Sequence, residues 1–535
     1  MNTRFQILYP LLLGVALALG LFIGMGLGGD RPDNPLVFRG SEADKFSQVV
    51  RLVDAEYVDS VEMDGRVDVA IQDFLQDLDP HSYYITAAER AEYSEPLEGN
   101  FDGIGIEFRI VKDTVMVVMP VMGGPSEKVG IQAGDRIVTV NDSNITGISI
   151  TNKKVMELLR GERGTTVDVS VQRRGKKKLI DFTITRGEIP IQSIPVWLKA
   201  DDETGYIRVS RFARTTHDEF KQAFNELGPG LKRIVVDLRG NGGGYLQTAI
   251  ALADEFLGEG EMIVYTEGRN QPKRTYMATD KGKLTDMEVI LLINEGSASA
   301  SEILAGAIQD NDRGTIIGRR SFGKGLVQDE MEFKDKSAIR LTIARYFTPS
   351  GRCIQKPYGE GVDYEHDYMD RLERGELLSA DSIALTDSIQ YRTKAGRTVY
   401  GGGGIMPDVF VPIDTSYNSE FFTDVLYSGV LNQFSFDYAD SRRDELGRYK
   451  DAKAFNGGFT ISAALFNDFL SNAAKEGFSP GEGALKRSEE ELKIRLKAGI
   501  ARVLWGEEGY FTVILKSDRE FQKAMTYVRS RSTSE

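Results

Sequence analysis

The stretch from 289 to 328 constrains the fold of this chain more than any other part. It begins with a run of apolar residues at 289–293, which is typical of a buried strand, and continues through a serine-rich turn at 296–302. A helical apolar pattern follows, then a second short strand at 315–317 and a lysine, Lys324, between two glycines. The order strand, helix, strand predicts an α/β crossover with serines where the helix begins.

This arrangement suits nucleophilic chemistry. A helix N-terminus offers unpaired backbone N–H groups and the positive end of the helix dipole, which stabilise an oxyanion. A lysine whose pKa is lowered by desolvation can take the proton of a serine hydroxyl. The alternative is structural: Ser299-Ala300-Ser301-Glu302 also matches a helix capping box, and Gly-Lys-Gly is often a solvated turn. The two features together favour catalysis over capping alone.

Two motifs in this stretch carry a resemblance to a known family. Gly-Ser-Ala-Ser-Ala-Ser-Glu at 296–302 and Gly-Arg-Arg-Ser-Phe-Gly-Lys-Gly-Leu-Val-Gln at 318–328 resemble the signature of the C-terminal processing peptidases, or tail-specific proteases. The resemblance implies that Ser299 is the nucleophile, Lys324 the general base and Gln328 the residue that orients the lysine. It also implies that the N–H of Ala300 is one oxyanion donor.

A second glycine-rich turn, at 239–246, follows a buried-strand pattern at 233–238 and precedes another helix. Its Asp-Leu-Arg-x-Asn-x-Gly-Gly pattern resembles the second signature of the family, which implies that Gly244 supplies the other oxyanion N–H, with Gly243 as the alternative. Asp237 and Arg239 are interpreted as structural. Phosphate binding is disfavoured because the turn lacks both a Walker lysine–threonine pair and a G-x-G-x-x-G followed by a suitable acid.

Strand patterns alternate with turns from 103 to 187, and a helix is predicted at 152–160. This part resembles a PDZ domain, in which a glycine-rich turn binds a terminal carboxylate and the peptide adds as a strand. The predicted carboxylate loop consists of Gly103, Ile104, Gly105 and Ile106. The alternative interpretation is a plain strand with two bulges.

The N-terminus predicts a membrane anchor. Residues 7–27 are apolar or glycine and follow Arg4, and about 20 such residues span a bilayer. A cleaved signal peptide is the alternative, with Ala16-Leu17-Ala18 as a cleavage site inside the run. We expect an uncleaved single-pass anchor in a bacterial inner membrane, with the N-terminus in the cytoplasm and the catalytic part on the periplasmic side.

Composition excludes several functions. The formal net charge of -14 argues against non-specific nucleic-acid binding. The single cysteine, Cys353, excludes a disulfide within the chain and a zinc site with two cysteine ligands. The proposed chemistry requires no metal or other cofactor. A trypsin-like protease is disfavoured because none of His81, His217 and His366 adjoins a plausible nucleophile, and a metalloprotease because no His-Glu-x-x-His run is present. His81, in a turn, is interpreted as structural.

The chain is too long for one hydrophobic core. We predict an anchor or signal at 1–29, a tether and helical region at 30–98, the PDZ domain at 99–188, a protease core at 189–412 and a helical extension at 413–535. The polar segment 357–397 is expected to be an insertion or mobile arm. The resemblance implies a crotonase-like α/β core with the PDZ domain inserted.

The predicted activity is that of a serine endopeptidase acting on proteins or peptides with apolar C-termini. The alternative is a membrane-tethered PDZ adaptor or chaperone that has lost catalysis. Homo-oligomers or an activating adaptor are possible partners, and the role of the C-terminal extension is left open.

Overall fold

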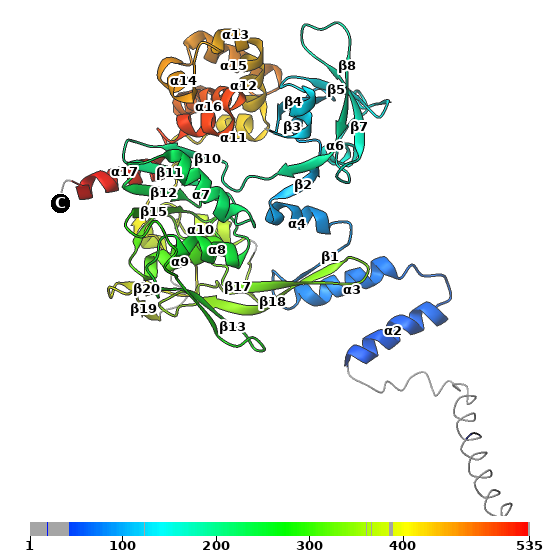
Figure 1. The fold of residues 1–535 in the computed structure, drawn as a ribbon, viewed down its shortest axis with the longest axis vertical. Coiled ribbons are helices and arrows are strands. Elements are labelled where there is room, and N and C mark those ends of the chain that lie inside the picture. The colour runs from blue at the N-terminus through cyan, green and yellow to red at the C-terminus, as the bar shows by residue number, and fades with distance from the viewer. Residues whose placement is uncertain are drawn as a thin grey trace, which may run out of the picture. The chain divides into compact units, whose positions relative to one another are not determined.

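The computed structural model describes residue 19 and residues 42–121, 123–359, 361–364, 366–384 and 389–532 (Figure 1). The predicted anchor at 7–27 therefore lies outside the described residues, apart from residue 19. Among the helices that are described, none is both long and apolar enough to cross a bilayer. The chain divides into two compact units, Met1–Leu75 and Gln76–Glu535, which are described separately.

The first unit contains α2 (Glu42–Glu56) and most of α3 (Asp64–Gln76). Both helices were predicted from apolar residues at helical spacing. On α2 this apolar stripe is partly exposed, including Phe46 and Val49.

A six-stranded sheet forms the centre of the second unit. Its strands, in spatial order, are β10 (Val196–Lys199), β11 (Thr204–Arg208), β12 (Arg233–Asp237), β15 (Glu288–Ile293), β16 (Gly314–Gly318) and β21 (Val409–Phe410). Strand β10 is antiparallel to β11, and the other neighbours are parallel. Continuous apolar runs such as that of β15 form strands that are buried on both faces of a parallel sheet.

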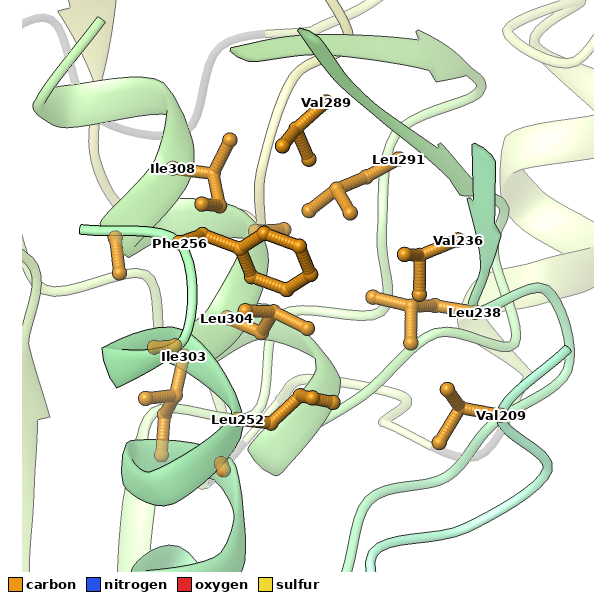
Figure 2. Close-up of a cluster of buried hydrophobic side chains, with 14 of the residues drawn as sticks. Val209, Val236, Leu238, Leu252, Phe256, Val289, Leu291, Ile303, Leu304 and Ile308 are labelled. Atoms are coloured by element: carbon orange, nitrogen blue, oxygen red, sulfur yellow. The ribbon is translucent and has the colours of Figure 1, made fainter. Parts of the chain in front are cut away.

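Helices α7 (Thr216–Leu227), α8 (Leu246–Asp254) and α9 (Ala300–Asp310) contribute to the core on one face of this sheet. Figure 2 shows part of that core, where Leu252, Phe256 and Leu304 face Val236 and Leu291 of the strands. All eleven residues of α9 are buried. The helix that begins next to Ser299 is therefore held on all sides.

The C-terminal extension covers the other face of the same sheet. Phe511, near the end of α16 (Glu482–Ile514), and Phe521 of α17 (Arg519–Ser532) pack against Tyr206 of β11. Ile290 of β15 belongs to the same cluster. The extension is thus a layer of the same core as the central sheet, because without it this apolar face would meet solvent.

A second sheet brings further parts of the chain to the site. It contains β1 (Tyr83–Ile85), β18 (Ala338–Phe347), β13 (Met262–Glu267) and β14 (Arg274–Met277), with β17 (Leu326–Glu332) paired to β18. A two-stranded ribbon of β19 (Gln390–Arg392) and β20 (Thr398–Tyr400) lies apart from it.

The polar segment 357–397 is not a loose arm throughout. After α10 (Asp367–Glu373) begins, Arg371 is buried and donates hydrogen bonds to the carbonyls of Arg320 (2.7 Å) and Ser321 (3.2 Å). The buried carboxylate of Glu376 accepts from both Arg320 and Arg371. Polar composition suggested exposure, but buried ion pairs hold this part against the turn before Lys324.

The predicted PDZ region forms its own sheet, made of β3 (Ile106–Ile110), β4 (Val115–Pro120), β5 (Arg136–Val140), β6 (Ser143–Asn144), β7 (Thr166–Gln172) and β8 (Ile180–Thr185). Helix α5 (Pro125–Val129) and helix α6 (Asn152–Leu159) complete it, and α6 shares a separate hydrophobic core with the sheet. The chain enters through α4 (Arg90–Glu98) and β2 (Asn100–Gly103). It leaves through β9 (Gly187–Pro190), which pairs with β2.

The extension is helical, as predicted. Its helices before α16 are α11 (Glu420–Tyr427), α12 (Val430–Ser441), α13 (Arg443–Leu446), α14 (Ala452–Gly458) and α15 (Ala463–Lys475). Helix α16 runs through this group and then kinks at Trp505 and Gly506, whose backbone angles are not helical.

Candidate active site

Two glycine- and serine-rich turns meet at one edge of the central sheet. Strands β12 and β15 are parallel neighbours, with Asp237 opposite Leu292. Each strand is followed at its carboxyl end by a turn and a helix, so the turns lie side by side. Asn241 joins them: its buried side-chain amide donates to the carbonyl of Val209 (2.9 Å), and its backbone carbonyl accepts from the N–H of Ala298 (3.0 Å).

Ser299 occupies a strained position at the start of α9. Its backbone angles are φ 54° and ψ -113°, a conformation that costs a residue other than glycine about 1–3 kcal/mol. Ala298 and Ala300 on either side are buried, whereas Ser299 is partly exposed. The strain therefore accompanies a serine that is accessible from solvent.

The hydroxyl groups of the other two serines of the cluster already donate hydrogen bonds. The buried hydroxyl of Ser297 donates to the carbonyl of Leu238 (2.8 Å), and that of Ser301 donates to the carbonyl of Asn241 (2.8 Å). In the part of the chain that the structure describes, the hydroxyl proton of Ser299 has no acceptor. Geometry thus separates Ser299 from its neighbours as the available nucleophile.

The structure distinguishes the two candidate oxyanion glycines. The N–H of Gly243 donates to the side chain of Asn241 (2.9 Å). Over the described ranges, the N–H groups of Gly244 and Ala300 have no acceptor. The two turns are in close contact, since a Cβ on Gly243 would lie 3.0 Å from the nitrogen of Ala300. Gly244, rather than Gly243, therefore has the donor available beside Ala300.

Lys324 and Gln328 are brought together as expected. The ammonium Nζ of Lys324 donates to Oε1 of Gln328 (2.9 Å), and Nε2 of Gln328 donates to the carbonyl of His81 (2.5 Å). Burial and, next, the charge of Arg340 lower the pKa of Lys324 to about 8. Over the described residues no hydrogen bond joins Nζ to the Ser299 hydroxyl, a contact that often tightens only when substrate binds.

Glu302 ties the nucleophile to the base. Its fully buried carboxylate accepts from the N–H groups of Ser299 (2.8 Å), Lys324 (2.8 Å) and Gly323 (2.7 Å), and from the Ser321 hydroxyl (2.5 Å). Burial raises the pKa of this carboxyl, although these hydrogen bonds oppose the rise. The capping interpretation is therefore compatible with the catalytic one, because Glu302 caps the helix and also fixes the turn that carries Lys324.

Tyr346, in β18, makes a second link between the same two residues. Its hydroxyl lies 3.1 Å from the carbonyl oxygen of Ser299 and 2.7 Å from that of Lys324. The side chain is buried, and burial followed by the charge of Glu302 raises the pKa of Tyr346 well above its usual range. Sequence reasoning missed Tyr346, because no local pattern marks a tyrosine in a distant strand.

His81 was interpreted as structural, and it lies beside Gln328. Its carbonyl holds Gln328, and its Nε2 is 2.8 Å from the Tyr364 hydroxyl. Burial and, next, the charge of Lys324 lower the pKa of His81 to about 4. The neutral ring and the backbone of His81 thus support Gln328.

Asp237 and Arg239 form bonds beneath the oxyanion turn. The fully buried carboxylate of Asp237 accepts from Arg239 (2.7 Å), Arg208 (3.0 Å) and Tyr206 (2.7 Å). Arg239 also pairs with Asp518 (2.8 Å), next to α17. These contacts anchor the end of β12 to the C-terminal layer.

The predicted carboxylate loop lies in the PDZ region, separate from the serine turn. Gly103, Ile104 and Gly105 are buried, and Gly105 has φ 72°. Within the described ranges, the N–H groups of Ile104 and Gly105 have no acceptor. Buried donors without partners are costly, so this loop is suited to a carboxylate. Among the described residues, no three His, Cys, Asp or Glu side chains are grouped to hold a metal ion.

Comparison with known proteins gives three family matches. Residues 203–366 match peptidase family S41, and residues 103–184 match the PDZ domain. Residues 421–506 match a family of unknown function.

Relatives match over more than half of the chain. A carboxy-terminal-processing protease of Bartonella bacilliformis is 37% identical over 317 residues, which are 58% of this chain and 72% of that protein. The carboxy-terminal processing protease CtpA of Bacillus subtilis is 33% identical over 318 residues, which are 59% of this chain and 67% of the relative. A solved photosystem II D1 C-terminal processing protease is 27% identical, covering 70% of this chain and 94% of its own, with a TM-score of 0.36.

Proposed function

Since the chain belongs to the carboxy-terminal processing proteases of peptidase family S41 and is a serine-type peptidase with a PDZ domain, we propose that Ser299, Lys324 and Gln328 form its catalytic group. One observation carries this assignment. Glu302 and Tyr346 each bond to the backbones of both Ser299 and Lys324. Residues 25 positions apart in sequence are thereby held as one unit.

The chemistry follows from the protonation state of Lys324. With a pKa of about 8, about a tenth of the lysine is neutral at pH 7, and this form can accept the Ser299 proton. Gln328 accepts one N–H of the amine, which orients the lone pair away from it. The serine oxygen attacks the peptide carbonyl, and the N–H groups of Ala300 and Gly244 donate to the oxyanion. Lys324 then protonates the leaving amine, and water hydrolyses the acyl-enzyme.

The PDZ domain selects the substrate in this proposal. A terminal carboxylate binds the N–H groups of the loop from Gly103 to Ile106, and the peptide adds as a strand to β3, which is an edge of its sheet. The partly buried, apolar side of β3, with Ile106 and Phe108, favours apolar C-terminal residues. The substrates are therefore proteins or peptides with apolar C-termini.

We also propose that residues 7–27 tether the enzyme to a bacterial inner membrane with its catalytic part on the periplasmic side. The support is the length of the apolar run and Arg4 before it. Protease added to intact spheroplasts should digest the catalytic part of the wild-type protein. When residues 7–27 are deleted, the protein should stay inside the cell and be protected. Digestion only after lysis of wild-type cells would reverse the orientation.

The catalytic assignment is tested with full-length protein in detergent and an unfolded substrate with an apolar C-terminus. Wild type, Ser299→Ala, Lys324→Ala and Lys324→Arg are compared, and products are identified by mass spectrometry. Only wild type should cleave, because arginine does not release its proton. Cleavage by Lys324→Arg would exclude Lys324 as the base. Cleavage by none would favour the alternative of a catalytically silent PDZ adaptor.

A further inference from the structure

The helices that match a family of unknown function contact the PDZ domain. We define residues 420–514, from α11 to the end of α16, as the helical module. We propose that the helical module holds the PDZ domain at a second point, besides the β2–β9 ribbon, and so fixes the orientation in which substrate C-termini are presented to Ser299. Presentation of substrate C-termini to Ser299 rests on the proposed function. The attachment of the PDZ domain to the helical module does not.

The first contact is made by Arg109 of β3. Ile106, Phe108 and Ile110 pack on the PDZ core, so the alternation of a strand places Arg109 on the opposite face. Its guanidinium carbon lies 5.9 Å from the ring centre of Phe436 in α12. Burial lowers the pKa of Arg109. An arginine on an outer strand face is normally solvated, so its desolvation over an aromatic ring marks a formed contact.

The second contact surrounds Asp440, near the end of α12. Arg174 of the PDZ domain lies 3.6 Å from the Asp440 carboxylate and donates to its backbone carbonyl (3.4 Å). Gly134 lies against the same carboxylate, since a Cβ there would be 3.0 Å from Oδ1. The absence of a side chain at Gly134 is what permits this approach.

The third contact is the kink of α16. Gly506, at the kink, lies next to Met119 of β4, because a Cβ on this glycine would lie 3.9 Å from the Met119 Cε. A few residues later, Phe511 stacks under Arg208 (5.2 Å to the ring centre) and packs on Tyr206. One helix therefore touches the PDZ domain and the catalytic sheet.

These contacts supplement a narrow connection. The PDZ domain is joined to the core through the short pairing of β2 with β9 and through the ion pair of Arg160 with Glu95 (2.6 Å). Two strands alone form a marginal connection, and a domain on such a ribbon reorients unless another interface holds it. The contacts of the helical module with Arg109, Arg174, Gly134 and Met119 add a second attachment to this ribbon.

In the orientation that the module holds, Lys324 and the two proposed oxyanion donors are in place. In the same structure Lys324 is bonded to Gln328, and the described part of the chain offers no acceptor to the N–H groups of Ala300 and Gly244. We therefore expect the docked arrangement to support presentation, so that loss of docking lowers the efficiency with which C-terminal substrates are cleaved.

The attachment of the PDZ domain to the helical module is tested by a distance measurement on the full chain. In a Cys353→Ser background, spin labels are attached at Lys128→Cys in the PDZ domain and Lys281→Cys in the core, both exposed positions. The distance distribution should be narrow, and Arg109→Glu combined with Arg174→Glu should broaden it. Lys176→Glu combined with Lys178→Glu, an equal charge change on an exposed loop of the same domain, is the control and should leave it narrow.

Asp440→Arg supplies an independent variant on the side of the module, and it should broaden the distribution in the same way. A distribution that stays narrow in both the Arg109/Arg174 variant and Asp440→Arg would overturn the proposal. Unchanged circular dichroism of each variant confirms that it has folded.

The presentation of substrate C-termini to Ser299 is tested with one peptide in two forms, a free C-terminal acid and a C-terminal amide. We expect the Arg109/Arg174 variant to lose about fivefold or more in kcat/KM for the acid, with the amide unchanged. If the Arg109/Arg174 variant cleaves the acid as fast as wild type or faster, the proposed role of the module in presentation is wrong. If wild type cleaves neither form, the proposed function fails, and the distance measurement still decides whether the module holds the PDZ domain.

Discussion

The two turns of the active site have the same architecture but meet different demands. In each, a parallel strand of the central sheet ends in a turn, and a helix begins that packs on the core of the sheet. The turn after β12 places a backbone donor, and glycine at Gly243 and Gly244 adopts positive φ (103° and 148°) without cost. The turn after β15 places a side chain, so Ser299 holds a positive φ of 54° that glycine would otherwise take.

The difference shows where supporting bonds are needed. At Gly244 close approach is sufficient, and a Cβ there would lie 2.1 Å from the carbonyl oxygen of Phe212. At Ser299 the strain must be offset, and Glu302 and Tyr346 bond to its backbone. The same two residues also hold Lys324, so support for the strain and alignment of the base come from one set of bonds.

The largest effect is expected on the serine side of this comparison. Ser299→Ala should lower kcat by about 10⁴-fold or more, because the nucleophile is lost. Ser297→Ala and Ser301→Ala each remove a buried hydrogen bond to the β12 side, so we expect a loss of about 1 kcal/mol in unfolding free energy with activity retained. Kinetics and urea unfolding separate these results. If a folded Ser297→Ala or Ser301→Ala protein has no turnover, that serine rather than Ser299 would be assigned as the nucleophile.

In the glycine-rich turn after β12, we expect activity to depend on the volume of the side chain and not on its chemistry. Gly244→Ala forces the turn away from Phe212 and displaces an oxyanion donor, so we expect kcat to fall by about 10²–10³-fold. Gly242→Ala is the matched control in the same turn, because a Cβ at Gly242 meets nothing within 4 Å. Steady-state kinetics measure both. Comparable losses in the two variants would show that the turn is generally sensitive and that Gly244 has no special place.

The pH dependence should belong to the serine side alone. The pKa of Lys324 is lowered to about 8, and the base acts only when neutral. Cleavage should therefore decline by about tenfold per pH unit as the pH falls below this value. Residual activity of Gly244→Ala should show the same inflection, since a backbone donor does not titrate. Wild-type kcat/KM that is constant from about pH 8 to about pH 5 would be incompatible with Lys324 as the base.

The smallest effect is expected from the supporting tyrosine. Tyr346→Phe removes the donor of the Lys324 carbonyl, whereas the Ser299 carbonyl still accepts from the N–H groups of Glu302 and Ile303. We expect a loss of about 1–3 kcal/mol in stability, and a fall of about tenfold in kcat with KM unchanged. Tyr265→Phe is the control, since Tyr265 lies on the adjacent strand β13 and stacks on Phe347. A Tyr346→Phe enzyme with wild-type kcat would show that Glu302 alone aligns Ser299 and Lys324.

Local pattern was enough to predict the strand–turn–helix units, whereas the roles of the residues within them came from the resemblance to a family. Apolar runs indicated β12 and β15, and motifs placed Ser299, Gly244 and Lys324 in adjoining turns. Parts that depend on distant pairing were not predictable. Tyr346 reaches the site only because β17 pairs with β18, and nothing near residue 346 marks that register. Likewise, the helical pattern of the C-terminal extension did not indicate that α17 covers Tyr206 and Ile290.

The assignment of Ser299 as a lysine-activated nucleophile is tested most directly by covalent labelling. A fluorophosphonate probe is incubated with wild type and with folded Lys324→Ala, and the modified peptide is identified by mass spectrometry. We expect labelling of wild type at Ser299 alone, and a rate at least about 100-fold lower in Lys324→Ala because the base is gone. Labelling at another residue, or equal rates in the two proteins, would contradict the assignment.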